Sequence, residues 1–168
     1  MNDAIHASNC TYLTFRLNDE LFGLNINLVR EVLEYTRITK VPLTAPYIRG
    51  VINVRGSVVP VVDLRRKFGL AGNGQTVDTC IIIVEFDMDG QASTMGALVD
   101  GVQEVLYIPP DQIEPPPRMG GRVNAPYIQG IGKLLDQFVI LMDMQAIFSQ
   151  EELCDLADMQ QTEETLGA

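Results

Sequence analysis

A long duplicated segment is the feature that most restricts how this chain can fold. Residues 45–64 read APYIRGVINVRGSVVPVVDL, and residues 125–144 read APYIQGIGKLLDQFVILMDM. Both copies begin with Ala-Pro-Tyr-Ile-x-Gly, continue as an aliphatic run and reach an aspartate, Asp63 or Asp143. Two copies over this length predict a pseudo-symmetric pair of units rather than a long array of repeats.

A second pair of matching segments supports the same division. Residues 23–33 and 96–106 share Val-x-Glu-Val-Leu. The second half carries extra residues between its two matching blocks, in the proline-rich segment 109–118, where a loop insertion costs little free energy.

The repeat and the local composition predict how the chain is divided. Residues 12–150 are expected to form one domain with two subdomains, at about 12–70 and 79–146. The polar start, residues 1–11, is predicted to be a flexible tail. Residues 151–168 carry acidic residues without basic ones and are predicted to form an acidic C-terminal helix that frays into a tail.

Each predicted subdomain contains about five short segments with the signature of β-strands. Leu13, Phe15 and Leu17 recur at every second position, as in a half-buried strand. Arg55-Gly56 separates two apolar runs and predicts a short hairpin. A short helix is expected over residues 64–70. Five strands that bury one face and hide their edges tend to curl into a small barrel, so we predict an all-β chain, although periodicity alone does not separate a barrel from a sandwich.

The composition argues against several classes of function. The net charge of −10 would repel the phosphate backbone of a nucleic acid. No run approaches the roughly 18 apolar residues of a membrane span, and the N-terminus lacks a signal peptide. We therefore expect a cytoplasmic protein without membrane insertion. Cys10, Cys80 and Cys154 are odd in number and lack metal-ligand spacing, which favours reduced structural thiols.

Catalytic chemistry finds little support in the sequence. The one histidine, His6, lies in the predicted tail, which argues against His-based triads and most zinc sites. Asp63 and Asp143 occupy equivalent places, as the two aspartates of an aspartic protease do, but neither lies in an Asp-Thr/Ser-Gly loop. Both end a strand and precede a helix-like segment, so we predict that each caps the following turn. The sequence does not support an enzyme.

The two halves differ at the hairpin that follows the shared Tyr-Ile-x-Gly. The first half has Asn-Val-Arg-Gly there, and the second has Lys-Leu-Leu-Asp. Arg55 is either a solvated turn residue, which composition favours, or a guanidinium fork that clamps carbonyl or carboxylate groups of a partner. Glu31 and Glu104 are either ordinary outward charges or the rim of an interaction patch. Val29 and Val102 are better explained as core residues on composition alone.

These motifs resemble the CheW family of bacterial chemotaxis coupling proteins. The most specific elements are Tyr-Ile-x-Gly-Val-x-Asn-Val-Arg-Gly and Val-Val-Pro-Val-Val-Asp-Leu-Arg. The position usually written Asn-Leu-Arg-Gly in the family is Asn-Val-Arg-Gly here, and the loop 115–121 follows no family pattern. The resembling stretches, in family order, are residues 22–33, 41–64, 96–106 and 127–143.

The resemblance implies two SH3-like five-stranded barrels packed side by side and an adaptor without catalysis, cofactor or metal. Its expected partners are the regulatory domain of the histidine kinase CheA and the cytoplasmic tip of methyl-accepting chemoreceptors, in membrane-bound receptor arrays. By matching position, the receptor side would carry Val29, Glu31, Gly50, Arg55 and Gly56. Kinase contacts would come from exposed aliphatic side chains at barrel ends, which the sequence does not identify.

Other functions stay open at this stage. Close relatives of the family serve type IV pilus signalling, and nothing in the sequence separates those pathways. No kinase or receiver sequence accompanies the module, so a stand-alone coupler is expected. A hydrolase built on the two aspartates would lose turnover on Asp63→Asn. A purely self-associating structural protein would be indifferent to kinase and receptor.

Overall fold

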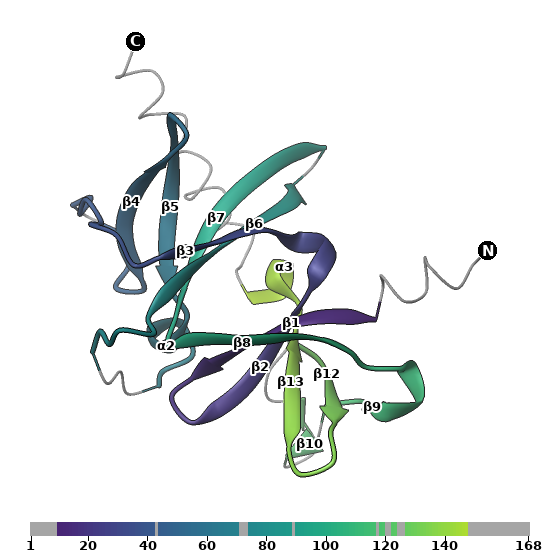
Figure 1. The fold of residues 1–168 in the computed structure, drawn as a ribbon. Helices are drawn as coiled ribbons and strands as arrows, with labels where there is room; N and C mark the ends of the chain where they lie inside the picture. Colours follow the sequence, from purple (N-terminus) through teal and green to yellow (C-terminus); the bar gives the residue numbers. More distant parts are fainter. Residues whose placement is uncertain are drawn as a thin grey trace.

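Two β-sheets form the fold (Figure 1). It is seen in a computed structural model that describes residues 10–147, apart from residues 43, 71–73, 89, 117, 120–121 and 124–126. The six-stranded sheet, sheet A, has the order β8 (Gly101–Tyr107), β1 (Thr11–Leu17), β2 (Glu20–Asn25), β13 (Phe138–Met142), β12 (Ile128–Lys133) and β9 (Ile113–Glu114). The five-stranded sheet, sheet B, has the order β3 (Val29–Glu34), β6 (Cys80–Met88), β7 (Gln91–Val99), β5 (Ser57–Asp63) and β4 (Ile48–Val54).

Smaller elements connect these strands. They are the helices α2 (Leu64–Lys67) and α3 (Met144–Ile147), the 3-10 turns η1 (Ile26–Leu28) and η2 (Pro110–Gln112), and the ribbon of β10 (Arg118–Met119) with β11 (Arg122–Val123). The predicted all-β class is confirmed. Among the described residues, no helix has the length and apolar character needed to cross a membrane.

Each sheet takes strands from both halves of the sequence. β1 and β2 pair with β8 and β13 of the second half, whereas β3 and β5 pair with β6 and β7. The predicted boundary between residues 70 and 79 therefore does not separate the two sheets, and contiguous subdomains at 12–70 and 79–146 are wrong in this respect. The physical reason is edge pairing, because the first two strands of each half cover the strand edges that the other half leaves open.

Both sheets close into barrels in the same way, because the chain that follows the first strand of the order pairs with a strand at the opposite end. In sheet B, Thr39 follows β3 and forms a bridge with Val51 of β4, at the far end of the strand order. In sheet A, β9 follows β8 in the sequence and pairs with β12, again at the far end. The closure covers the terminal edges of each sheet. The two barrels agree with the SH3-like pair that the family resemblance implied.

Three hydrophobic clusters follow from this arrangement. The largest lies between the sheets, where Phe15 of β1 and Ile82 of β6 belong to one buried group. β6 also supplies Ile81 and Ile83 to a second cluster made of sheet B residues. A third cluster, around Leu141, consists mainly of sheet A residues. β6 is therefore buried on both faces, which explains its nearly continuous apolar sequence.

The two copies of the repeated segment form equivalent hairpins, as predicted. β4 pairs with β5, and β12 with β13, and both pairings shift register just before the shared glycine. The backbone N–H of Asp63 donates to the carbonyl oxygen of Tyr47 at 2.7 Å, and that of Asp143 donates to Tyr127 at 2.8 Å. In each copy, the aspartate at the end of the second strand of the hairpin therefore bonds to the tyrosine of the shared Ala-Pro-Tyr-Ile-x-Gly motif.

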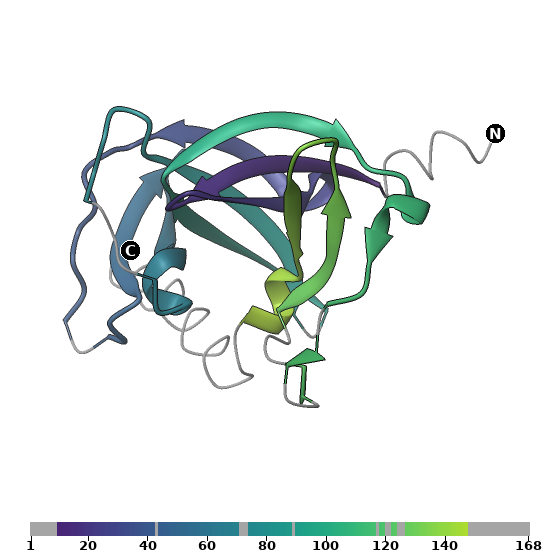
Figure 2. The ribbon, with the colours of Figure 1, turned by 90° about the horizontal axis from the view of Figure 1, so that it is seen from below.

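Helical structure is shorter than predicted. α2 covers only the first part of the expected helix over 64–70, because Gly69 adopts φ 73° and Leu70 N–H bonds back to the carbonyl of Arg65 at 2.8 Å. This is a common helix C-terminus with glycine in the left-handed region. α2 and α3 lie on the same side of the sheets (Figure 2). The predicted tail 1–11 lies largely, and the predicted helix and tail 151–168 wholly, outside the described residues.

Candidate partner-binding site

The hairpin between β4 and β5 presents Arg55 to solvent. Arg55 and Gly56 form its two-residue turn with φ of 51° and 87°, the left-handed geometry that matches the twist of hairpin strands. Asn53 stabilises the turn, since its side-chain oxygen accepts a hydrogen bond from the Gly56 N–H at 2.8 Å. The Arg55 side chain remains 78% exposed. The predicted hairpin and its exposed arginine are therefore confirmed.

A forked ion pair joins Arg55 to Glu31, which lie far apart in the sequence. Arg55 Nη1 donates to Glu31 Oε2 at 2.7 Å, and Nη2 donates to Oε1 at 3.4 Å. Glu31 lies on β3 and Arg55 follows β4, the two terminal strands of sheet B. Barrel closure therefore brings the two charges together. The guanidinium has five N–H donors, so the pair leaves donors for a second acceptor on a partner.

Gly50 has a structural role at the closure of sheet B. It is buried with φ of 142°, and an added Cβ would lie 2.1 Å from the carbonyl oxygen of Thr39. Thr39 and Val51 exchange backbone hydrogen bonds of 2.9 and 2.8 Å at the same place. Only glycine allows the two backbone segments that close sheet B to approach this closely.

The predicted site residues therefore fall into two groups. Glu31, Arg55 and Gly56 lie together on the surface, and no described atom comes within 4 Å of an added Cβ on Gly56. Gly50 is buried at the barrel closure, and half-buried Val29 packs against the cluster between the sheets. The core interpretation of Val29 from composition is supported by this packing.

The equivalent hairpin in sheet A has different chemistry. Leu135 takes the place of Arg55 in the repeat, and its exposure of 104% means that the side chain touches little else. Phe138, at the start of β13, is 62% exposed. Glu104, the counterpart of Glu31, is exposed, and Lys133 instead pairs with Glu114 of β9 at 2.6 Å. One barrel thus offers a charged tip and the other an apolar tip.

A buried ionic network lies where the two sheets meet, and the sequence analysis missed it. Asp63 caps α2, accepting hydrogen bonds from the backbone N–H groups of Arg65 and Arg66. The buried Arg65 guanidinium lies 3.4 Å from Asp63 Oδ1 and 2.8 Å from Asp100 Oδ1. Asp100 also accepts from the Asn18 N–H at 2.6 Å. The network links α2 to the β1–β2 turn of the other sheet, and an arginine two residues after the first repeated aspartate was its one sequence signal.

This network also determines the role of Asp63. The capping prediction is confirmed for Asp63, whose carboxylate is engaged by backbone amides and arginines. The carboxylate of Asp143 is exposed, and its capping role stays a prediction. No group of three or more His, Cys, Asp or Glu side chains with metal-binding geometry occurs among the described residues. Burial raises the pKa of the Cys80 thiol above its ordinary value of 9.0, as expected for a core thiol.

Comparisons with known proteins agree with this architecture. The family model for the CheW-like domain matches residues 11–152. The chemotaxis protein CheW of Klebsiella aerogenes is 36% identical over 142 residues, covering 84% of this chain and 83% of that protein. CheW of Rhizobium meliloti is 30% identical over 153 residues, covering 90% and 96%. The crystal structure of the scaffolding protein TtCheW from Thermoanaerobacter tengcongensis matches with a TM-score of 0.74 and 38% identity, covering 86% of this chain and 95% of that one. The double barrel, the repeated motif and these relatives together show that the chain belongs to the CheW family.

Proposed function

We propose that this chain is a non-catalytic adaptor that couples transmembrane chemoreceptors to the histidine kinase CheA in chemotaxis signalling. The observation that carries the proposal is the exposed Glu31–Arg55 pair at the closed edge of a CheW-family barrel. The relatives that support it are named as chemotaxis and scaffolding proteins. An adaptor needs binding surfaces on a rigid frame, and the two closed barrels supply such a frame.

The charged tip of sheet B is the proposed receptor contact. Arg55 keeps unused donors while Glu31 holds its guanidinium in place, which lowers the conformational entropy lost on binding. The open space beside Gly56 lets a partner backbone approach the turn. A partner that offers carbonyl or carboxylate oxygens would receive charge-assisted hydrogen bonds there.

The apolar tip of sheet A is the proposed kinase contact. Leu135 and Phe138 are both exposed on one hairpin, although burial of such side chains is favourable. Exposed aromatic and aliphatic groups at a hairpin tip can act as anchors in a partner's pocket. They are exposed apolar groups at a barrel end, the kind of side chain that the family resemblance leads us to expect at the kinase contact.

Separate binding measurements test the two contacts. Receptor-containing vesicles and purified CheA are each titrated with the full-length chain, and receptor-dependent kinase activity is measured on the same samples. Arg55→Ala should weaken receptor binding about tenfold or more, because a charge-assisted hydrogen bond contributes roughly 1.5–3 kcal/mol and about 1.4 kcal/mol is a factor of ten. Its binding to CheA should not change, and Arg55→Lys should restore little.

The matched variant removes the apolar tip. Leu135→Ser with Phe138→Ser should weaken CheA binding and leave receptor binding intact. Exchanging the charges, Glu31→Arg with Arg55→Glu, keeps an ion pair but should not restore receptor binding if Arg55 contacts the receptor. Arg16→Gln serves as a charge control outside both surfaces, since Arg16 lies on β1 and pairs with Asp78. The proposal is wrong if Arg55→Ala and the double serine variant both bind receptor and kinase normally.

A further inference from the structure

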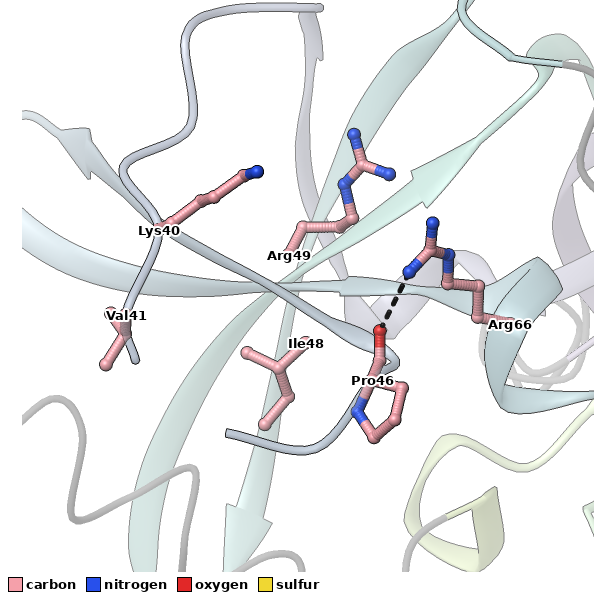
Figure 3. Close-up of a pocket in the computed structure, with 6 residues that line it drawn as sticks. All are labelled: Lys40, Val41, Pro46, Ile48, Arg49 and Arg66. Carbon is pink, nitrogen blue, oxygen red and sulfur yellow. Dashed lines mark hydrogen bonds between the residues drawn. The ribbon is translucent and has the colours of Figure 1, made fainter. Parts of the chain in front are cut away.

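A cationic pocket lies between the loop before β4, the start of β4 and the start of α2. Its volume is about 220 Å³, and its lining consists of Lys40, Val41, Pro46, Ile48, Arg49 and Arg66. The cationic ends of the lysine and the two arginines gather on one side of the pocket (Figure 3). Arg66 is held there in part by a hydrogen bond to the carbonyl oxygen of Pro46 at 3.4 Å.

The charges around this pocket do not balance. Asp63 is buried behind it, 3.8 Å from Arg49 Nη1 and 4.0 Å from Arg66 Nε, but the same carboxylate also pairs with Arg65 and caps α2. Lys40 is exposed. Within the described part of the chain, no second carboxylate forms a salt bridge with Lys40, Arg49 or Arg66. The pocket therefore keeps an excess of positive charge in a chain whose net charge is −10.

The chain itself carries a complementary segment. Residues 148–168 contain six acidic residues and no lysine or arginine, and four of the six lie within residues 151–158. These four are Glu151, Glu152, Asp155 and Asp158. Carboxylates are the ligands that guanidinium groups bind best in a forked geometry.

The described chain ends close to the helix that carries Arg66. The N–H of Asp143, just before α3, donates to the carbonyl oxygen of Tyr127 at 2.8 Å. The ring of Tyr127 stacks on Phe68, directly after α2, with 4.4 Å between centroids. From Ile147, four residues of extended chain to Glu151 span roughly 13 Å. A tether this short gives an effective concentration in the millimolar range or above.

We propose that the acidic segment 151–158 of this chain docks in the cationic pocket through carboxylate contacts with Lys40, Arg49 and Arg66. The contact is electrostatic and lies on the solvent side of the pocket, since the Arg66 side chain is 57% exposed. It therefore weakens as salt rises. An acidic segment of a partner protein would have to displace residues 151–158 of this chain in order to bind in the same pocket.

Native Cys154 lies inside the acidic segment and offers a labelling position in the full-length chain. Cys10→Ser removes the half-buried second thiol, and Cys80 is buried. A nitroxide on Cys154 broadens the NMR signals of nearby backbone amides. The signals of Lys40, Arg49 and Arg66 should lose most of their intensity at low salt. They should recover at about 1 M NaCl, where the Debye length is about 3 Å.

Charge-matched variants make the experiment decisive. Lys40→Gln with Arg66→Gln should restore the pocket signals at low salt, whereas Arg30→Gln with Lys133→Gln, which removes two charges elsewhere, should not. The proposal would be overturned if broadening persisted in the variant with Lys40→Gln and Arg66→Gln. It would also be overturned if the chain with the intact pocket showed no broadening near the pocket at low salt. A control mixes spin-labelled chain without isotope enrichment with isotope-enriched chain that carries no spin label. Only contacts between copies broaden signals in this mixture. Broadening of the pocket signals there would assign the pocket to a second copy. Well-dispersed amide spectra establish that each variant is folded.

Discussion

At the scale of residues, the two aspartates of the repeat have different surroundings despite their equivalent positions. Asp63 is buried, caps α2 and pairs with Arg65, whereas the carboxylate of Asp143 is exposed. The repeat makes their positions equivalent because the segments that precede the two aspartates are similar. Their energetic roles differ because only Asp63 has a buried arginine beside it.

Replacement by alanine should reveal this difference. Asp143→Ala should cost about 1 kcal/mol, as the loss of a helix cap does. Asp63→Ala should cost about 3 kcal/mol, at the low end for breaking a buried ion pair, because Arg65 keeps Asp100. Asp63→Asn retains the capping acceptor and should isolate the charge contribution. Urea denaturation of the three variants is the measurement, and equal midpoints for the two alanine variants would contradict the prediction.

Buried titratable groups should limit stability at alkaline pH. Burial raises the pKa of Cys80 above 9.0 and the pKa values of Tyr12 and Tyr127 above 10.0. Below these ordinary values, all three groups are protonated in both the folded and the unfolded chain. Above them, the unfolded chain ionises first, so the free energy of unfolding falls as pH rises from about 9 through the raised folded values.

Urea midpoints between pH 7 and 11 check the sign and the assignment. Cys80→Ala should lower overall stability but flatten the first part of the decline, near pH 9. In the native chain, Cys10 should react with a thiol reagent before Cys80, because Cys80 is buried and its raised pKa keeps it protonated. A stability that rises with pH in this range would contradict the expectation.

At the scale of elements, replacing each of two glycines by alanine compares the stability that barrel closure requires with the stability that turn geometry requires. Gly50→Ala forces a left-handed φ on alanine and places its Cβ against the Thr39 carbonyl, so it should cost about 2–6 kcal/mol. Gly56→Ala meets the backbone restriction alone and should cost about 1–2 kcal/mol. Thermal melting of both variants gives the comparison. If Gly56→Ala were the more destabilising change, the assigned role of Gly50 in closure would be wrong.

At the scale of the whole molecule, the exchange of strands should make the two halves interdependent. Residues 1–75 contain β1 and β2 but lack their sheet A partners, and β3 to β5 lack β6 and β7. Isolated hairpins are marginally stable at best in water. This fragment alone should therefore give a poorly dispersed NMR spectrum, and mixing it with residues 76–168 should restore dispersion. A well-folded isolated fragment would contradict the interdependence.

The sequence by itself determined the features that depend on neighbours along the chain. Alternation at Leu13, Phe15 and Leu17 predicted a strand, and Arg55-Gly56 predicted a hairpin. The position of Asp63 at a strand end predicted a helix cap. The repeated motif predicted two equivalent hairpins and, through its resemblance, the family. The strand, the hairpins and the cap follow from local geometry, in which a few residues set the backbone conformation.

Only the tertiary structure decided which strands pair across the halves and which charges meet. Both halves carry the same apolar alternation, so pairing within a half or between halves would bury similar side chains, and periodicity does not distinguish the two. The Glu31–Arg55 pair, the bridging of Asp63 and Asp100 by Arg65, and the cationic pocket all depend on that choice. These contacts join residues that are distant in sequence, and their geometry exists only once the barrels have closed.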